Sequence, residues 1–371
     1  MLLIWIYAQI CVILQCKYIK HMQSVSLKEF ASGTINTFLN SIGFVLENEA
    51  SNTLLREGIL HFVNELSDYY EEGTKLFPEI IILDSIDYFN TIPIKKKFKL
   101  YSGEINYQQL CKALKMCAPF ATNGWLIYVC INNQTLEWGV ITSELSETSI
   151  PLGIQIIHDR PQNDCHVVYL RNTGQKNVLL QSLGGDAGCQ ITMSLNDPIQ
   201  NGANNIDSFC NQFIEMLGDD IGEEFDTYIR KIVNRALRLG HGNLFVIIED
   251  GQRFPEILKG GISLEESPID LYDAYMEIQN VEDTASIVQA NYKLQMLSNL
   301  AIGMMNQDGI TIFTKSAKIV GFHYIVENNT PQENALLGGA RTKAYEALCN
   351  CQEIGTVFMR KQEGETKLHI R

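Results

Sequence analysis

The sequence predicts a protein of mixed α and β structure, in which a separate α+β domain precedes a mixed β-sheet flanked by helices, of class α/β or α+β. The chain has 371 residues, which is long for one compact domain. Its composition, 46% apolar and 19% charged, is typical of soluble globular proteins. A polar stretch at Asn196–Asn205 separates two series of helical and strand-like segments. We therefore expect an apolar segment at residues 1–21, a first domain at 22–205, and a second at 206–371 whose core is 224–371.

The amino-terminal segment allows three interpretations. Its first sixteen residues, MLLIWIYAQICVILQC, are almost wholly apolar and are followed by Lys17 and Lys20. Sixteen residues are short for a bilayer span, and no positive charge precedes the run, as a signal peptide requires. The run is a short membrane anchor, a buried strand or helix, or the product of a start placed upstream of Met22. A start at Met22 or a peripheral segment is favoured. This predicts a cytoplasmic protein, with membrane association through residues 1–16 left open.

The first domain is expected to begin with helices and to continue as short strands. Apolar residues recur at helical spacing from about Ser26 to Tyr70, and Glu79–Leu83 is a strand-like run. Gly184–Gly188 reads GGDAG, and because no helix with a GK[ST] sequence follows it, a turn is favoured over a phosphate loop. The other expected elements are a helix near Tyr107–Cys117, a hairpin of Gly124–Ile131 with Leu136–Ile141, and strands at Gly153–Ile157, Cys165–Leu170 and Asn177–Gln181.

The second domain is expected to open with a long helix from about Ser208 to Leu239, broken near Gly218 and ended by Gly240. Asn243–Ile248 follows as a buried strand, with Asp250-Gly251 as a hairpin turn before a second strand at Phe254–Leu258. The later expected elements are helices at Pro268–Ile278 and Thr284–Met304, strands at Ile310–Thr314 and Lys318–Val326, a short helix at Ala340–Cys349, and a hairpin of Ile354–Arg360 with Thr366–Ile370.

Charge and cysteine content exclude some classes of function. The net charge is −14, so adhesion to nucleic acid through its phosphates is not expected, although a local basic pocket for a nucleotide is compatible with it. The ten cysteines contain no CxxC pair. Free thiols in a reducing cytoplasm are therefore favoured over a structural zinc site.

Two motifs of the second domain have residues suited to phosphate chemistry. Asp308-Gly309 lies at an expected junction of helix and strand, and Gly338-Gly339-Ala340-Arg341-Thr342-Lys343 lies where a loop enters a helix. Glycines at a helix start let backbone N–H groups approach an anion, and the helix dipole favours negative charge there. Arg341 and Lys343 add two cations, and an aspartate could hold the divalent metal that accompanies a nucleoside triphosphate. An ordinary turn and an ordinary helix cap explain the same residues, and both interpretations stay open from spacing alone.

The order of these motifs resembles diadenylate cyclase domains of the DisA_N class. Such domains have a DGA motif, a strand pair, an LGTRHRAA-like motif entering a helix, and a terminal hairpin. Asp308-Gly309-Ile310 occupies the place of DGA, and Leu337–Ala344 occupies the place of the second motif. Gly242–Glu249 is similar to the first strand of the family, and Gly260–Leu264 to the turn after it. The likeness runs from about Glu224 to Arg371 and rests on four landmarks in order.

The resemblance implies a fold, an activity and a set of site residues. Two protomers would face each other as a homodimer or higher homo-oligomer, each holding one ATP, and the 3′-hydroxyl of one would attack the α-phosphate of the other. Asp308 would bind the divalent metal, manganese or magnesium, and activate the hydroxyl. Arg341 and Lys343 would bind phosphate oxygens. The catalytic set is then Asp308, Gly309, Arg341 and Lys343, and the nucleotide-binding set is Ile310 with Gly338, Gly339, Ala340, Arg341, Thr342 and Lys343.

Several residues depart from the family pattern and define an alternative. Ile310 replaces the alanine of DGA, and GARTK replaces GTRHR, so that Ala340 lacks a hydroxyl and Lys343 lacks the bidentate fork of arginine. Arg360-Lys361 stands where family members often have an acidic pair. The leading interpretation is a diadenylate cyclase regulated by the first, sensor-like domain. The alternative is a catalytically degenerate module that binds a nucleotide or cyclic dinucleotide and signals to a partner.

Overall fold

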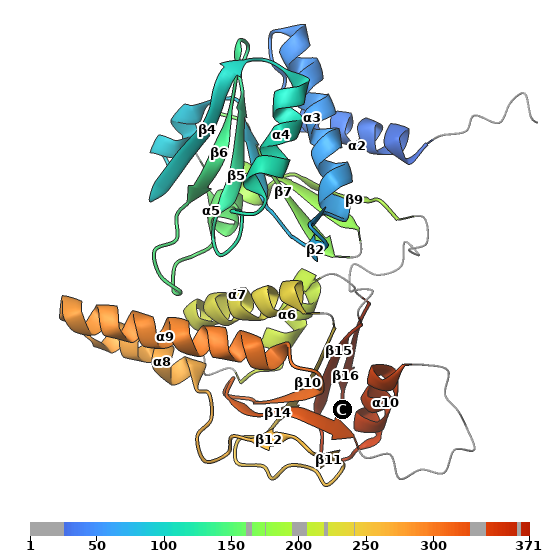
Figure 1. Ribbon diagram of the computed structural model, residues 1–371, viewed down its shortest axis with the longest axis vertical. Helices are drawn as coiled ribbons and strands as arrows, with labels where there is room; N and C mark the ends of the chain where they lie inside the picture. The colour runs from blue at the N-terminus through green and yellow to red at the C-terminus, as the bar shows by residue number, and fades with distance from the viewer. Residues whose placement is uncertain are drawn as a thin grey trace, which may run out of the picture.

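The computed structural model contains two mixed β-sheets, each flanked by helices (Figure 1). It describes residues 26–160, 165–174, 176–194, 206–218, 222–240, 242–326, 339–361 and 365–371. The predicted mixture of helices and mixed sheets is therefore present. Residues 1–25, the linker stretch at 195–205, His241 and Gly338 lie outside the described ranges. Within those ranges no helix has both the length and the apolar character needed to cross a membrane.

The first sheet has seven strands in the order β4-β6-β5-β3-β7-β8-β9. Neighbouring strands in this sheet are antiparallel, except that β3 and β5 are parallel. Their register pairs Ile80 with Ile127 at one end and Leu83 with Cys130 at the other. The strands are β3 (Ile80–Leu83), β4 (Lys96–Glu104), β5 (Leu126–Ile131), β6 (Thr135–Thr142), β7 (Val167–Gly174), β8 (Asn177–Ser182) and β9 (Gly188–Thr192), and a separate ribbon joins β1 (Tyr70–Glu71) to β2 (Thr74–Lys75).

Helices cover both faces of the first sheet. Alternate residues of β3 point to opposite faces, as a pleated strand requires, so Ile80 and Ile82 pack on one side and Ile81 and Leu83 on the other. The first side is covered by α2 (Leu27–Ser41), α3 (Glu49–Ser67) and α4 (Tyr107–Cys117). The second side is covered by the 3₁₀ helix η1 (Ile86–Asn90) and by α5 (Leu152–His158).

The helical region expected from about Ser26 to Tyr70 is present as two helices, because the chain turns between α2 and α3 at Gly43, whose φ is +69°. One sequence expectation for this part of the chain is wrong. Gly153–Ile157, expected as a strand, belongs to helix α5. A short apolar run fits a buried strand and a buried helix equally well by periodicity, and here Pro151 stands at the start of a helix.

The second sheet also has seven strands, in the order β11-β14-β13-β10-β15-β16, with β12 paired to β14. β10 is central: it runs parallel to β13 and antiparallel to β15. The strands are β10 (Asn243–Ile248), β11 (Leu258–Lys259), β12 (Ile262–Ser263), β13 (Ile310–Thr314), β14 (Ile319–Val326), β15 (Thr356–Arg360) and β16 (Thr366–Ile370).

One face of the second sheet packs against four helices and the other against one. On the first face, Phe245 and Phe313 join a cluster with α6 (Ile206–Glu215), α7 (Glu223–Leu239), α8 (Leu271–Asn280) and α9 (Thr284–Met305). On the opposite face, Tyr345 and Leu348 of α10 (Ala340–Asn350) pack against Val246 and Ile312. The break between α6 and α7 is where the sequence predicts it.

The expected hairpin at Asp250-Gly251 is wrong. Both edges of β10 are already paired, with β13 and β15, so no strand at Phe254–Leu258 can add to it. Only Leu258 and Lys259 of that region form a strand, and they pair with β14. A fully buried run such as Asn243–Ile248, which is apolar from Leu244 onward, is typical of a central strand with neighbours on both sides.

Candidate functional site

The two predicted phosphate motifs meet at one edge of the second sheet. β10 and β13 are parallel, so the segments that enter them, Gly242 and the turn Asn306–Gly309, lie at the same edge. α10 begins beside this edge and places Arg341 in its first turn. The distance from Nη2 of Arg341 to Oδ1 of Asp308 is 3.9 Å. The structure therefore brings together the aspartate of one motif and the arginine of the other.

Both members of this pair remain accessible. The side chain of Asp308 is 94% exposed and that of Arg341 is 30% exposed. An exposed ion pair of this length contributes little to stability, because water screens it.

The backbone around Asp308 is fixed by contacts with β14. Gly309 has φ +108°, and a Cβ there would lie 2.8 Å from the carbonyl oxygen of Tyr324, so a glycine is required. His323 has φ +61° at an irregularity in the β13–β14 pairing, and its Nδ1 donates to the carbonyl oxygen of Asp308 at 2.5 Å. Ile310, which follows the turn, is buried in the apolar core on the α10 side of the sheet. Contact of its side chain with a nucleotide stays a prediction.

The residues at the start of α10 differ in their exposure and in the direction of their side chains. Gly339 is the N-cap and is exposed, as is Ala340, whereas Thr342 is half-buried and Lys343 is exposed. Residues two apart on a helix do not face each other, so Arg341 and Lys343 point in different directions from the helix axis. Arg341 faces Asp308, and a phosphate contact of Lys343 stays a prediction.

Gly242, which the sequence places only at the start of the strand that resembles the family's first strand, is a positioning residue. It has φ +115°, and a Cβ there would overlap Nη1 of Arg341 and lie 2.9 Å from the carbonyl oxygen of Arg360. The guanidinium of Arg341 thus lies directly against the backbone that enters β10. The signal available in the sequence was the pair Gly240 and Gly242 immediately before a buried strand.

Arg360 stands where the resemblance implies an acidic pair, and its side chain has a structural role. It is buried, and its Nη1 donates to the carbonyl oxygen of Leu237 and, at 3.4 Å, to that of Gly240. It therefore satisfies carbonyls at the C-terminal end of α7. Burial, with the nearby charge of Arg238, lowers the pKa of Arg360 to about 10. Lys361 pairs with Glu365 at 2.7 Å across the terminal hairpin.

The carboxylates of this edge fit a metal that arrives with a nucleotide better than a metal held by protein alone. Among the described residues, no group of three His, Cys, Asp or Glu side chains lies close enough to hold an ion. Asp308 presents one exposed carboxylate. Magnesium is commonly bound by one or two carboxylates together with substrate phosphates, which this arrangement allows.

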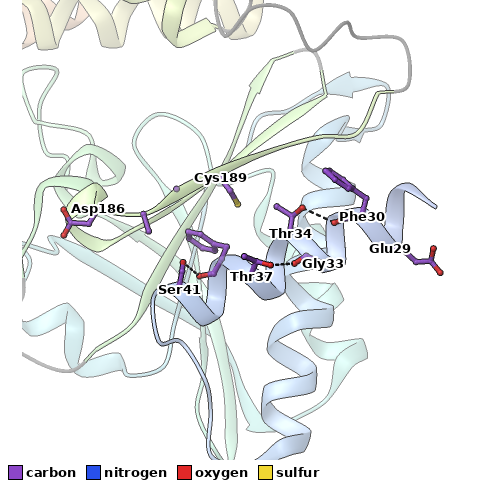
Figure 2. A pocket seen from close by; sticks show the side chains of 11 residues that line it. Glu29, Phe30, Gly33, Thr34, Thr37, Ser41, Asp186 and Cys189 are labelled. Carbon is purple, nitrogen blue, oxygen red and sulfur yellow. Dashed lines mark hydrogen bonds between the residues drawn. The ribbon is translucent and has the colours of Figure 1, made fainter. Parts of the chain in front are cut away.

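A groove between α2 and β9, of about 640 Å³, is lined by hydroxyl groups that already donate to backbone carbonyls (Figure 2). The hydroxyls of Thr34 and Thr37 each donate to the carbonyl four residues earlier in α2, at 3.0 Å. Ser41 donates to Phe38 at 2.7 Å. The adjoining GGDAG segment is a turn between β8 and β9, as predicted, with Gly184 and Gly185 at positive φ. This groove does not add a candidate site for chemistry.

Known proteins do not place the chain in a family. A scan of protein-family models, a search of curated proteins and a search of solved structures each find no match to it. The candidate site therefore rests on the sequence landmarks and on the geometry at this edge of the second sheet.

Proposed function

We propose that residues 206–371 bind ATP at the edge defined by Asp308 and Arg341, and that the protein is a diadenylate cyclase. The reaction would join two ATP molecules into cyclic di-AMP with release of two pyrophosphates. The observation that supports this most is the 3.9 Å approach of Asp308 to Arg341, because the two motifs are distant in sequence. A carboxylate and a guanidinium side by side beside a helix start suit a metal-bound triphosphate.

The arrangement of the second sheet is compatible with the fold that the resemblance implies. A mixed sheet with a parallel pair at its centre has helices on both faces, and a terminal hairpin, β15–β16, closes its order. The aspartate follows a helix and enters a strand, and the arginine lies in the first turn of a helix. We propose that this is a diadenylate cyclase fold.

Each residue has a role that follows from its chemistry. Asp308 would accept the proton of the 3′-hydroxyl, whose oxygen forms a bond to the α-phosphorus of the facing ATP while the bond to the β-phosphate oxygen breaks. Arg341 would neutralise charge on the phosphates, a contribution that dominates in phosphoryl transfer. A divalent metal, manganese or magnesium, held by Asp308 and the phosphates would supply further neutralisation. Because each site holds one ATP, turnover would require a second copy of the chain.

The second candidate is a degenerate module that binds a nucleotide or cyclic dinucleotide without turnover. Three observations favour it: Ile310 is buried in the core, Lys343 is directed away from Arg341, and Arg360 is engaged by the carbonyls of α7. In this case Arg341 would still bind phosphate, and the output would pass to a partner through the first domain.

Product analysis separates the two candidates. The purified chain is incubated with ATP and manganese or magnesium, and the nucleotides are separated by chromatography. A cyclase yields cyclic di-AMP and pyrophosphate in a ratio of one to two. A chain that binds ATP by calorimetry, loses that binding in Arg341→Ala and forms no product is the degenerate module. A chain that does not bind ATP at all contradicts both.

A further inference from the structure

Helix α7 has two faces with different partners. Its apolar residues, among them Phe225, Ile229 and Val233, are buried in the core of the second sheet. Its other face carries Arg230, Lys231, Asn234, Arg235 and Arg238, which recur at alternating steps of one and three residues and so share one side of the helix. In Figure 1, α7 lies between the two sheets. The cationic face is therefore turned toward the first sheet.

Ion pairs hold this face of α7 against the first sheet. Lys231 and Glu144 are 2.5 Å apart, with side chains only 9% and 10% exposed. Arg235 pairs with Glu147 at 3.1 Å, and Arg238 pairs with Glu79 at 3.3 Å. The position of α7 is thus set by three pairs along its length.

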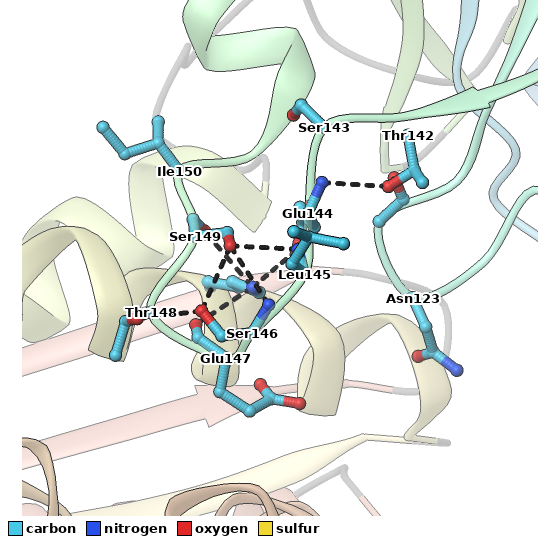
Figure 3. A network of polar contacts seen from close by, with 12 residues as sticks. Asn123, Thr142, Ser143, Glu144, Leu145, Ser146, Glu147, Thr148, Ser149 and Ile150 are labelled. Carbon is cyan, nitrogen blue, oxygen red and sulfur yellow. Dashed lines mark hydrogen bonds and ion pairs between the residues drawn. The ribbon is translucent and has the colours of Figure 1, made fainter. Parts of the chain in front are cut away.

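The loop that carries two of these carboxylates is internally braced (Figure 3). The hydroxyl of Ser149 accepts from the backbone N–H groups of Leu145 and Ser146, both at 3.2 Å. The N–H of Glu144 donates to Thr142 Oγ1 at 3.0 Å. The loop therefore presents its carboxylates in a fixed direction.

A cavity of about 230 Å³ lies between the cationic face of α7 and the edge of the first sheet where β3 and β5 begin. Six cationic side chains line it, and three carboxylates do: Glu79, Glu144 and Asp207. The lining therefore has a formal charge of 6 − 3 = +3, in a chain whose net charge is −14. Each of the three carboxylates pairs with one cation of the lining. Glu144 pairs with Lys231 and Glu79 with Arg238, as described above, and Asp207 pairs with Arg171 at 2.9 Å.

The remaining three cations of the lining have no carboxylate partner within the lining. Lys75 and Arg235 pair with carboxylates outside the lining, Asp68 and Glu147. Arg230 donates to the neutral side-chain oxygen of Asn211. Among the described residues, Arg230 is thus the lining cation that has no carboxylate within ion-pair distance, and burial raises the pKa of the nearby carboxyl of Asp226, four residues earlier in α7, a rise that this charge opposes.

The rest of the lining is apolar. The ring of Phe77 has the ammonium of Lys75 at 5.7 Å and the guanidinium of Arg238 at 5.5 Å from its centroid. Leu239, at the end of α7, is 66% exposed. The apolar wall is formed by Leu76, Phe77, Trp125, Pro151, Ile154 and Leu239. Cations beside an apolar wall are complementary to a molecule that has an anionic group on an apolar body.

We propose that this cavity binds a small amphipathic anion, a carboxylate or a phosphate ester with an apolar body. The anionic group would lie at Arg230 and its neighbours on α7, and the apolar body would lie along Phe77, Trp125 and Leu239. None of the residues of the ATP edge line this cavity. The inference therefore stands apart from the proposed cyclase activity.

The test uses the full chain with octanoate and octyl phosphate as anionic probes, 1-octanol as the neutral probe, and acetate and inorganic phosphate as headgroups without an apolar body. Binding is measured by calorimetry, with thermal unfolding as a second readout. At about 1 mM we expect octanoate or octyl phosphate, but none of the other three, to bind and to raise the unfolding temperature. The two anionic probes distinguish recognition of a carboxylate from recognition of a phosphate.

Two substitutions locate the binding. Arg230→Gln removes one charge and leaves no carboxylate of the lining without its partner, and it should weaken binding of the preferred probe about tenfold. Leu239→Ser removes exposed apolar surface and should weaken binding of the preferred probe about fivefold, with little effect on folding. Lys115→Gln, an exposed lysine on α4, is the matched control and should leave binding unchanged.

Three results would overturn the proposal: no binding of either anionic probe, equal binding of 1-octanol, or unchanged binding in both Arg230→Gln and Leu239→Ser. Asp308→Asn should bind the probe as the unaltered chain does. A failure of cyclic di-AMP synthesis together with retained probe binding would contradict the cyclase and not the cavity, and the reverse pair of results would contradict the cavity alone.

Discussion

The position of the Arg341 guanidinium depends on a residue without a side chain. Gly242 leads into the central strand β10, and the space that a Cβ would fill there is occupied by Nη1 of Arg341. The same glycine has φ +115°, a conformation that costs other residues strain. The approach of α10 to the sheet edge, and with it the 3.9 Å distance to Asp308, therefore depends on this position.

Replacing Gly242 by alanine should displace Arg341 from its place beside Asp308, where we propose that ATP binds. We expect the affinity for ATP to fall about tenfold, because a displaced guanidinium loses a charge-assisted phosphate contact. Calorimetric titration with ATP measures the effect. The matched control is Gly303→Ala in α9, where a Cβ meets no atom within 4 Å and should leave ATP affinity unchanged. Equal ATP affinity in the two variants would show that Arg341 does not bind phosphate from this position.

Individual residues differ in how far the sequence could place them. Asp308 and Arg341 were predictable because each stands at a junction where a helix meets a strand or a loop. Gly242 was not, since its role depends on a side chain about a hundred residues away in sequence that packs against it. From the sequence, Arg360 could be described only as a departure from a motif. The structure shows that its buried guanidinium binds the carbonyls at the end of α7.

At the scale of elements, helix α7 is stabilised on its two faces by different forces. One face is buried in apolar contacts, and the other depends on ion pairs, of which Lys231 with Glu144 is the most buried. Burial raises the pKa of Glu144, an effect that the charge of Lys231 opposes. Removing Lys231 would leave a buried carboxylate without its partner, which is far more costly than the loss of an exposed pair.

Lys231→Met should lower the free energy of unfolding by about 3 kcal/mol at neutral pH. In urea titrations, Lys293→Met is the matched control: its partner Glu277 is exposed, and the loss should be below about 1 kcal/mol. A carboxyl with a raised folded-state pKa binds its proton more tightly when folded, so the Lys231→Met deficit should shrink as pH falls toward 4.5. A loss equal to that of the control, or one independent of pH, would contradict the assignment.

The elements of the second sheet were predicted well because their patterns are strong. The buried runs Asn243–Ile248 and Ile310–Thr314 are strands with the expected bounds, and the helix at Tyr107–Cys117 in the first part of the chain also matches. The failures are local. Gly153–Ile157 is too short for its period to distinguish helix from strand. Asp250-Gly251 is a turn, but pairing partners depend on the topology of the whole sheet, which local sequence does not report.

At the scale of the whole molecule, α7 links the cavity between the sheets to the edge that carries Asp308 and Arg341. Arg238, near its end, contacts Glu79 of the first part of the chain, and Arg360 of β15 binds the carbonyls of Leu237 and Gly240 on either side of it. The chain then passes to Gly242, beside Arg341. The sequence could not place this cavity, because its walls come from segments far apart in the chain that meet only when α7 docks on the first sheet.

Turnover by the whole molecule should require two copies. If each ATP edge holds one nucleotide and the attacking hydroxyl comes from another copy, product formation should rise more steeply than protein concentration at low concentration. Initial rates measured over a dilution series, alongside the mass of the particle by light scattering, test this. A rate strictly proportional to the concentration of a proven monomer would argue against the facing arrangement.

The most direct test of the central claim is synthesis of cyclic di-AMP by Asp308→Asn, measured beside ATP affinity. The carboxylate should act mainly in the transition state, so we expect product formation to be abolished while ATP affinity stays within about tenfold of that of the unaltered chain. Asp186→Asn, an exposed aspartate in the glycine-rich turn between β8 and β9, is the matched control and should retain full synthesis. Undiminished synthesis by Asp308→Asn would contradict the assignment of catalysis to this edge of the second sheet.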